Sequence, residues 1–268
     1  MHLSPARRRL AIAMRVAIPV AFAATLFFVP STSATSVSDA EALVVSWINH
    51  DRMDRGLAPL RSDGDLAAIA GIRASRMASA NVMSHTVGGN LASQLDWYNV
   101  AWYRYAEDIG WSTASFPTTS ARSIYLAWMG SSEHRALLLS DQLNYIGVGL
   151  AYRSSNHRTY ASAVMAESPD HTRPVARVTG VTRSGDDVRW TWNGYDPRLQ
   201  THTAGFRDYD VQYRVGSGTW SLIRDNTTST SIALANRPGG SYYSIRVRGT
   251  DRRGNVGAWS SESRIWVP

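Results

Sequence analysis

Histidine, acidic and serine side chains are the groups in this 268-residue chain that could do chemistry, because the sequence contains no cysteine. Two histidines, His85 and His134, stand 49 residues apart, and no histidine pair has the H-E-x-x-H spacing that places two zinc ligands on one helix. The sequence also lacks the Gly-x-Ser-x-Gly motif that presents a nucleophilic serine. Any metal or catalytic site therefore depends on the fold to bring distant residues together.

Aromatic side chains crowd the segment that precedes Glu107. They are Trp97, Tyr98, Trp102, Tyr103 and Tyr105. Such a density of rings is typical of the wall of an apolar ligand groove, and it is equally typical of a packed core. Both interpretations stay open, because a sequence does not show which rings are exposed.

The elements that must position these residues begin with two helices. Ser38 to Glu41 has the form of a capping box, which predicts the start of a helix that ends at Gly56. Asp65 predicts the start of a second helix. The apolar stripe of this second helix consists of Leu66, Ile69, Ala70, Ala74 and Met77.

Further helices and then strands complete this part of the chain. The spacing of apolar residues predicts a helix over 119–129, and Ser131 or Ser132 can cap another that ends at Leu139. Strands are expected at 145–152 and 160–166. Helices first and strands last favour a layered α+β domain over alternating βαβ units.

Residues 168–174 contain two prolines among polar residues, which predicts a linker. Beyond it, apolar and polar residues alternate with the two-residue period of a strand, at 188–192, 209–215 and 243–247. About seven short strands separated by turns predict an antiparallel β-sandwich. We therefore expect two independently folded domains that limited proteolysis would separate near 168–174.

The first 34 residues have the anatomy of a signal peptide. A basic segment precedes an apolar run from Val16 to Val29, and small residues up to Ala34 offer a cleavage site. The alternative is an uncleaved anchor, but the run is short for a stable membrane span. Arg8-Arg9 also suits a twin-arginine signal, so the general and the twin-arginine export routes both stay open. We expect a secreted protein, extracellular or associated with the cell wall.

Charge is distributed unevenly along the chain. Residues 35–172 carry 10 Arg and 13 acidic residues, whereas residues 173–268 carry 14 Arg and 8 acidic residues, a net charge of +6. The arginines of the second part are scattered, so we expect no nucleic-acid binding. A module of this charge could still contact an anionic wall polymer.

Residues 39–167 resemble the bacterial branch of the CAP superfamily (SCP/PR-1-like) in the order and spacing of several short motifs. These are Ile48-Asn49-x-x-Arg52-x-x-x-Gly56-Leu57-x-Pro59-Leu60, Met83-Ser84-His85-Thr86, Ala106-Glu107-Asp108-Ile109, Trp128-x-x-Ser131-x-x-His134-Arg135 and Ile146-Gly147-Val148-Gly149. In the third motif Asp108 replaces the asparagine of the family. The run Tyr243-Ser-Ile-Arg-Val-Arg-Gly-Thr-Asp251, followed by Gly254-Asn255 and Trp259-Ser260, resembles the last strands of fibronectin type III domains, and this resemblance covers most of residues 174–268.

These resemblances imply an α-β-α layered CAP domain at 35–167 and, after the 168–174 linker, a fibronectin type III-like sandwich at 175–268. The cavity of the CAP family is lined by two histidines and two glutamates. His85, Glu107 and His134 match three of them, and Ser131 stands where PR-1-like relatives carry the fourth. We place Glu133, next to His134, at the rim of the cavity. The resemblance implies that the first three could bind Zn²⁺ or another divalent cation. A hydrogen-bonded network without metal is the alternative.

Three functions are compatible with this sequence. The first is a non-catalytic extracellular or cell-envelope binding protein whose cavity takes a small apolar or envelope-derived ligand. The second is a metal-assisted hydrolase that acts on peptide or cell-envelope polymer. The third is a structural wall protein with a vestigial cavity. We favour the first, because no second carboxylate, oxyanion donor or nucleophile can be assigned.

Overall fold

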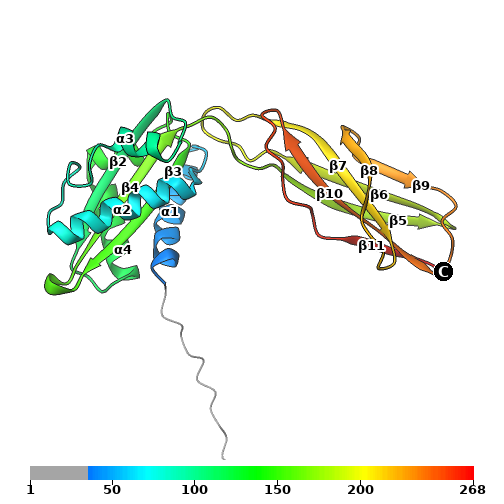
Figure 1. The fold of residues 1–268 in the computed structure, drawn as a ribbon, viewed down its shortest axis with the longest axis horizontal. Coiled ribbons are helices and arrows are strands. Elements are labelled where there is room, and N and C mark those ends of the chain that lie inside the picture. The colour runs from blue at the N-terminus through cyan, green and yellow to red at the C-terminus, as the bar shows by residue number, and fades with distance from the viewer. Residues whose placement is uncertain (1–35) are drawn as a thin grey trace, which may run out of the picture. The chain divides into compact units, whose positions relative to one another are not determined.

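The computed structural model describes residues 36–268, so the predicted signal peptide lies outside the described residues. Helices and one sheet occupy the part up to Glu167, and the part from Val175 onward is built of strands (Figure 1). The first sheet has the strand order β1-β3-β4-β2, with β1 parallel to β3 and the other pairs antiparallel. These strands are β1 (Arg61–Ser62), β2 (Arg104–Ser112), β3 (Tyr145–Arg153) and β4 (Arg158–Glu167), with the short turn η1 (Ser154–Asn156) between the last two.

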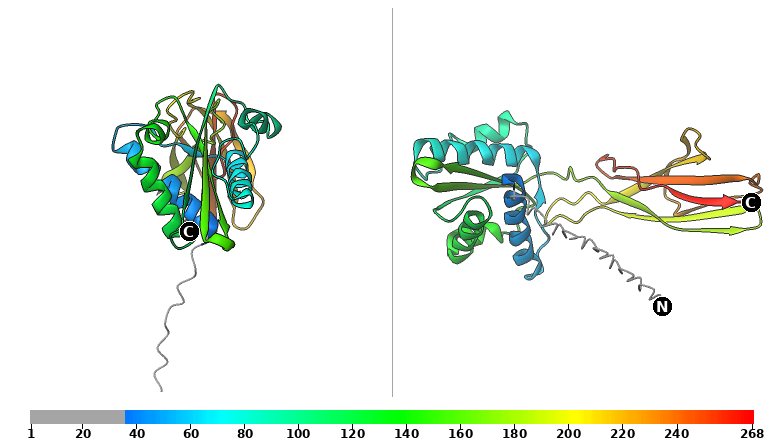
Figure 2. Two further views of the ribbon diagram at one scale, coloured as in Figure 1. Left: turned by 90° about the vertical axis from the view of Figure 1, so that its left-hand side faces the viewer. Right: turned by 90° about the horizontal axis from the view of Figure 1, so that it is seen from below.

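Helices cover both faces of this sheet. One face carries α2 (Gly64–Ala80), against which α3 (Leu91–Trp97) packs. The other face carries α1 (Val37–Met53), α4 (Thr118–Gly130) and α5 (Ser132–Leu138). The right-hand view of Figure 2 shows the sheet edge-on between these two layers. The predicted α-β-α layered architecture is therefore confirmed.

Two glycines of β3 allow α2 to lie unusually close to the sheet. A β-carbon on Gly147 would lie 2.0 Å from the amide nitrogen of Ala67, and one on Gly149 would lie 2.2 Å from that of Gly71. Both distances are far below van der Waals contact, so any larger residue would push the helix away. The Ile146-Gly147-Val148-Gly149 motif thus fixes the helix that carries part of the candidate site.

The helix starts differ from the predicted ones by one or two residues. The capping box of α1 is formed by Ser36 and Asp39 and not by the expected Ser38 and Glu41. Glu41 instead accepts a hydrogen bond from the amide of Leu150, which ties α1 to β3. At α2 the capping side chain is Asp63, two residues before the predicted start. Helix α3 and strand β2 lie in a segment for which no regular element was predicted.

The C-terminal part is a sandwich of two antiparallel sheets, as predicted. One sheet has the order β11-β10-β7-β8 and the other β5-β6-β9. The strands are β5 (Val175–Ser184), β6 (Asp187–Tyr195), β7 (Phe206–Val215), β8 (Ser221–Thr227), β9 (Ser231–Leu234), β10 (Ser241–Asp251) and β11 (Ser263–Val267). Its core includes Trp190, Val211 and Ile245, all from the alternating apolar positions of the sequence.

The predicted linker has no helix or strand, but it is not freely exposed. Ser168 and Asp170 are each only 2% exposed. The amide of Ser168 donates to the side chain of Asn144, and the hydroxyl of Tyr145 donates to Asp170. The domain boundary at 168–174 stays a prediction, and these contacts predict slow cleavage there, because proteases require an accessible, locally unfolded backbone.

Across residues 36–268, no helix combines the length and the apolar character needed to cross a membrane.

Candidate functional site

A buried arginine on α2, Arg73, organises the polar centre of the first domain. Its side chain is 2% exposed and its Nε lies 2.5 Å from Oε1 of Glu107. A second donor, Nη2, lies 2.7 Å from Oε2 of the same carboxylate, so the ion pair is bidentate. Arg73 also donates to the backbone carbonyls of His85 and Gly89 and to the amide oxygen of Gln94. Together these five hydrogen bonds hold the loop after α2, helix α3 and strand β2 in one arrangement.

Glu107 projects from β2 towards α2 and is only 4% exposed. Besides Arg73, it accepts hydrogen bonds from the hydroxyl of Ser162 on β4, at 2.7 Å, and pairs with Nδ1 of His85 at 2.8 Å. Burial alone raises the pKa of this carboxyl, but the hydrogen bonds from Arg73, His85 and Ser162 outweigh that effect and hold the pKa below its usual range. Glu107 is therefore a stable carboxylate at neutral pH.

His85 lies at the solvent edge of this cluster. Its side chain is 57% exposed, and the contact with Glu107 orients one ring nitrogen inward. The predicted association of His85 with Glu107 is thus present in the structure. The imidazole closes the carboxylate off from solvent on one side.

Gly88 makes room for the arginine beneath the loop. A β-carbon at this position would lie 2.9 Å from Nη1 of Arg73, so a side chain would displace the guanidinium. Gln94 of α3 donates to the carbonyl of Gly88 while accepting from Arg73. The loop and α3 are therefore held by the same buried cation that pairs with Glu107.

His134 lies in a separate pocket next to the edge strand β2. The pocket has a volume of about 230 Å³ and is mostly apolar. Its walls are Met83, Ile109, Gly110, Trp111, Ile124, Ala127, Trp128, Ser131 and His134. Within residues 36–268, the buried Nδ1 of His134 has no hydrogen-bond partner. We call this cavity the His134 pocket.

Ser131 and Glu133, the other two residues predicted for the cavity, have different positions. Ser131 lines the His134 pocket and is the N-cap residue of α5, although its side chain makes no capping hydrogen bond. Glu133 lies in the first turn of α5, where its side chain is exposed and does not line the pocket. A carboxylate in the first turn favours the helix, since it faces the positive end of the helix dipole.

The predicted metal ligands do not form one ligand set in this arrangement. Among the described residues, His85, Glu107 and His134 do not belong to any group of three ligand atoms within 4.8 Å of one another. The carboxylate oxygens of Glu107 are already occupied by Arg73, Ser162 and His85. The charge of Arg73 would repel a divalent cation at this carboxylate. The donor set therefore does not fit Zn²⁺ as it stands.

Asp108, next to Glu107 on β2, has the opposite environment. Adjacent side chains of a strand point to opposite faces, so Asp108 shares its face with Gly110 and not with Glu107. Gly110 lies against Ile124 and Trp128 of α4, so Asp108 faces the layer of α4. Asp108 is fully buried and neither carboxyl oxygen has a hydrogen-bond partner within the described residues. Burial, and secondarily the charge of Glu107, raises its pKa to about 8. Asp108 is thus mostly protonated at neutral pH.

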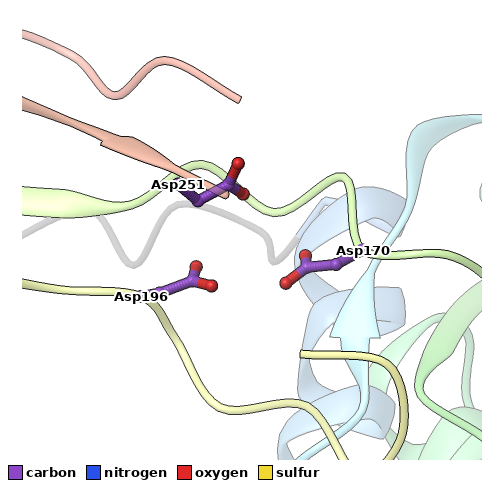
Figure 3. A group of neighbouring side chains, drawn as sticks. All are labelled: Asp170, Asp196 and Asp251. Carbon is purple, nitrogen blue, oxygen red and sulfur yellow. The ribbon is translucent and has the colours of Figure 1, made fainter. Parts of the chain in front are cut away.

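A group of three acidic side chains lies farther along the chain, formed by Asp170, Asp196 and Asp251 (Figure 3). Backbone amides donate to two of these carboxyls, those of Thr172 and Ala204 to Asp170 and that of Gly205 to Oδ2 of Asp196. The buried Oδ1 of Asp196 has no hydrogen-bond partner among the described residues. Burial raises the pKa of Asp196, and the charges of Asp170 and Asp251 add to this shift. The three carboxyls hold together the turns around them.

Arg73 was missed from the sequence although a signal for it exists. It follows Ile69 by four residues and precedes Met77 by four, so it falls on the apolar stripe of α2. Arg52 on α1 is likewise a charged residue at a core position, because it follows the buried Val44 and Ile48 at the same four-residue spacing. A charged residue at a core position of a helix predicts a buried partner.

Comparisons with known proteins identify the family of the first domain. Residues 45–165 match the family model of CAP, the cysteine-rich secretory protein family. They form a CAP domain. A relative of this domain is an uncharacterised protein of Bacillus subtilis (strain 168), YkwD, with 29% identity over 122 residues. The match covers 44% of this chain and 46% of YkwD, so less than half of either protein is shared.

Solved structures similar to each part of the chain are also known. An extracellular protein of Bacillus anthracis that contains an SCP domain is 20% identical, with a TM-score of 0.43, and the match covers 49% of this chain and 41% of that one. For the C-terminal part, an Fn3-like protein of Clostridium thermocellum is 23% identical, with a TM-score of 0.27 and coverage of 36% and 96%.

Proposed function

We propose that this protein is a secreted binding protein whose CAP domain takes a small, largely apolar ligand in the His134 pocket without turning it over. The observation that carries the proposal is the pocket itself: its walls are mostly apolar, and the buried Nδ1 of His134, one of its lining residues, has no hydrogen-bond partner among residues 36–268. Buried polar atoms need a hydrogen-bond partner, and a polar group on the ligand would supply it once the imidazole ring turns this nitrogen towards the pocket. The volume of about 230 Å³ favours a ligand smaller than a typical drug.

Hydrolysis is less well supported by the polar cluster. A general base works best when its pKa lies near the working pH, whereas the pKa of Glu107 is held low by Arg73, His85 and Ser162 despite the opposing effect of burial. The ion pair with Arg73 also disfavours a catalytic metal at this carboxylate. The metal-assisted hydrolase is therefore the weaker alternative, and the vestigial cavity of a structural wall protein is the third.

Methyl NMR with 1-octanol as the probe tests the binding function. We expect shifts confined to Met83, Ile109 and Ile124, because their side chains line or border the pocket. Ala127→Leu should abolish these shifts by filling the pocket, while Ala136→Leu, on the exposed surface of α5, should preserve them. Absence of shifts in the unmodified protein would overturn the proposal. So would hydrolysis of a peptide or wall-polymer substrate that is lost in His134→Ala.

The proposed secretion and wall contact have their own tests. The B. anthracis relative is described as extracellular, which supports export of this chain. N-terminal sequencing of protein from culture and wall fractions should show a chain that starts at Thr35. The +6 charge of residues 173–268 supports contact with an anionic wall polymer, which should weaken as the salt concentration rises. An intact N-terminus in the membrane fraction would exclude the cleaved signal.

A further inference from the structure

Trp97, at the end of α3, presents most of its indole ring to solvent. Its exposed fraction is 84%, the highest of any large apolar side chain in residues 36–268. Tryptophan carries one of the largest apolar surfaces of any residue, and most of that surface is normally buried. Its exposure here is not explained by the fold, since α3 is already anchored by buried Leu95.

The exposed indole borders a groove between α2, α3 and the loop of residues 88–90. The groove has a volume of about 420 Å³. Two aromatic rings, Trp97 and Tyr98, line it together with polar side chains. The polar lining is Arg76 from α2 and Asn90, Ser93 and Gln94 from the loop and α3.

Several of these polar groups have donors that the protein does not use. Within the described residues, Nδ2 of Asn90, Oγ of Ser93 and Nη2 of Arg76 donate no hydrogen bond to another protein group, although Oδ1 of Asn90 and Nη1 of Arg76 are engaged. All three side chains are exposed. They are therefore available to acceptors on a ligand at the same groove.

An aromatic face flanked by unused amide, hydroxyl and guanidinium donors suits a pyranose, which has both an apolar face and hydrogen-bonding oxygens. The ring C–H groups of a sugar stack on indole, and its hydroxyl and acetamido oxygens accept hydrogen bonds. We propose that this groove is an oligosaccharide subsite in which one sugar stacks on Trp97 and is held by Arg76, Asn90 and Ser93. It is separate from the His134 pocket, because the two cavities share no lining residue.

Isothermal titration calorimetry tests this subsite with two probes, N,N′,N″-triacetylchitotriose and trigalacturonic acid. We expect at least one to bind, and Trp97→Ala to weaken that binding about tenfold through loss of stacking. Ser93→Leu should block the groove and have a similar effect. The matched control is Trp266→Ala, which removes an indole that is 45% exposed on β11 and should change the affinity less than twofold.

Three results would overturn the subsite. They are no binding of either probe to the unmodified protein, binding that Trp97→Ala leaves within twofold, and equal losses in Trp97→Ala and Trp266→Ala. Unfolding curves of each variant show whether the fold is kept, and little change is expected, because Trp97 and Ser93 are exposed. The 1-octanol shifts at the His134 pocket should persist in Trp97→Ala, so failure of this subsite is distinguishable from failure of the proposed function.

Discussion

The two faces of strand β2 carry neighbouring carboxyl groups in opposite electrostatic states. On the face towards α2, Glu107 is paired with Arg73 and two further donors, and its pKa is lowered. On the face towards α4, Asp108 is fully buried without a hydrogen-bond partner among the described residues, and its pKa is raised to about 8. Similar burial therefore gives a carboxylate on one face and a protonated acid on the other.

This difference shows that burial does not by itself determine what a carboxyl group can do. Desolvation raises the pKa of both groups, and only Glu107 has the cation and hydrogen bonds that reverse the effect. In the CAP domain the polar cluster is thus internally neutralised. His134, by contrast, has a buried Nδ1 without a hydrogen-bond partner in the described part of the chain.

The largest expected effect comes from removing the cation on the α2 face. Arg73→Met should lower the free energy of unfolding by about 3–5 kcal/mol, because it leaves Glu107 as an uncompensated buried charge. Urea denaturation at pH 7 measures this loss. In the control, Arg55→Met removes an exposed arginine that pairs with Asp51 and should cost at most about 1 kcal/mol. Equal losses in the two variants would contradict the proposed role of Arg73.

Asp108→Asn should have an effect of opposite sign. Because the pKa of Asp108 is higher in the folded protein, the unmodified chain should lose up to about 1.4 kcal/mol of stability per pH unit between pH 4 and pH 8. The asparagine variant lacks this dependence and should be more stable at pH 8 by about 2–4 kcal/mol. Denaturation curves from pH 4 to pH 9 provide the measurement. A variant that is less stable at every pH would show that the carboxyl has a partner.

Glu107→Gln should destabilise the protein by about 1–3 kcal/mol at pH 7, since it leaves Arg73 without its counter-charge. The lowered pKa of Glu107 means that this stabilisation is present above the unfolded value of 4.5 and is lost as the pH falls through the folded value. The difference between the variant and the unmodified protein should therefore shrink in acid. A difference that grows as the pH falls would reverse the sign of the proposed shift.

The smallest effect is expected at the exposed edge of the cluster. His85→Ala removes a half-exposed partner of Glu107 and should cost at most about 1 kcal/mol. Denaturation at pH 7 measures it. A loss as large as that of Arg73→Met would mean that His85 is a principal support of the cluster.

Much of the fold was predictable because the helices and strands are periodic. The apolar stripe of α2 and the alternation in β6, β7 and β10 each point to one buried face. Strand β2 was not predicted, since Arg104, Glu107 and Asp108 place charges on both faces and hide the alternation. Two of these residues, the buried Glu107 and Asp108, make β2 central to the candidate site.

The candidate site was only partly predictable. The resemblance placed His85, Glu107 and His134 in one cavity, whereas the structure pairs the first two and places His134 in a different pocket. The second helix was recognised, but the role of Arg73 within it was not. Pairing of a helix residue with a strand residue 34 positions away depends on tertiary packing. In the sandwich, the alternation of apolar residues predicted the strands, and short turns predicted neighbours such as β5 and β6. The pairing of β7 with β10 and of β6 with β9, which are distant in sequence, again depends on tertiary packing.

Zinc titration by calorimetry tests most directly whether Arg73, and not a metal ion, neutralises Glu107. The account predicts the same heats for the unmodified protein, Glu107→Gln and His85→Ala, with no binding that depends on either side chain. One-to-one zinc binding that is present in the unmodified protein and lost in both variants would contradict it. That result would mean that zinc displaces Arg73 and that Glu107 and His85 are metal ligands.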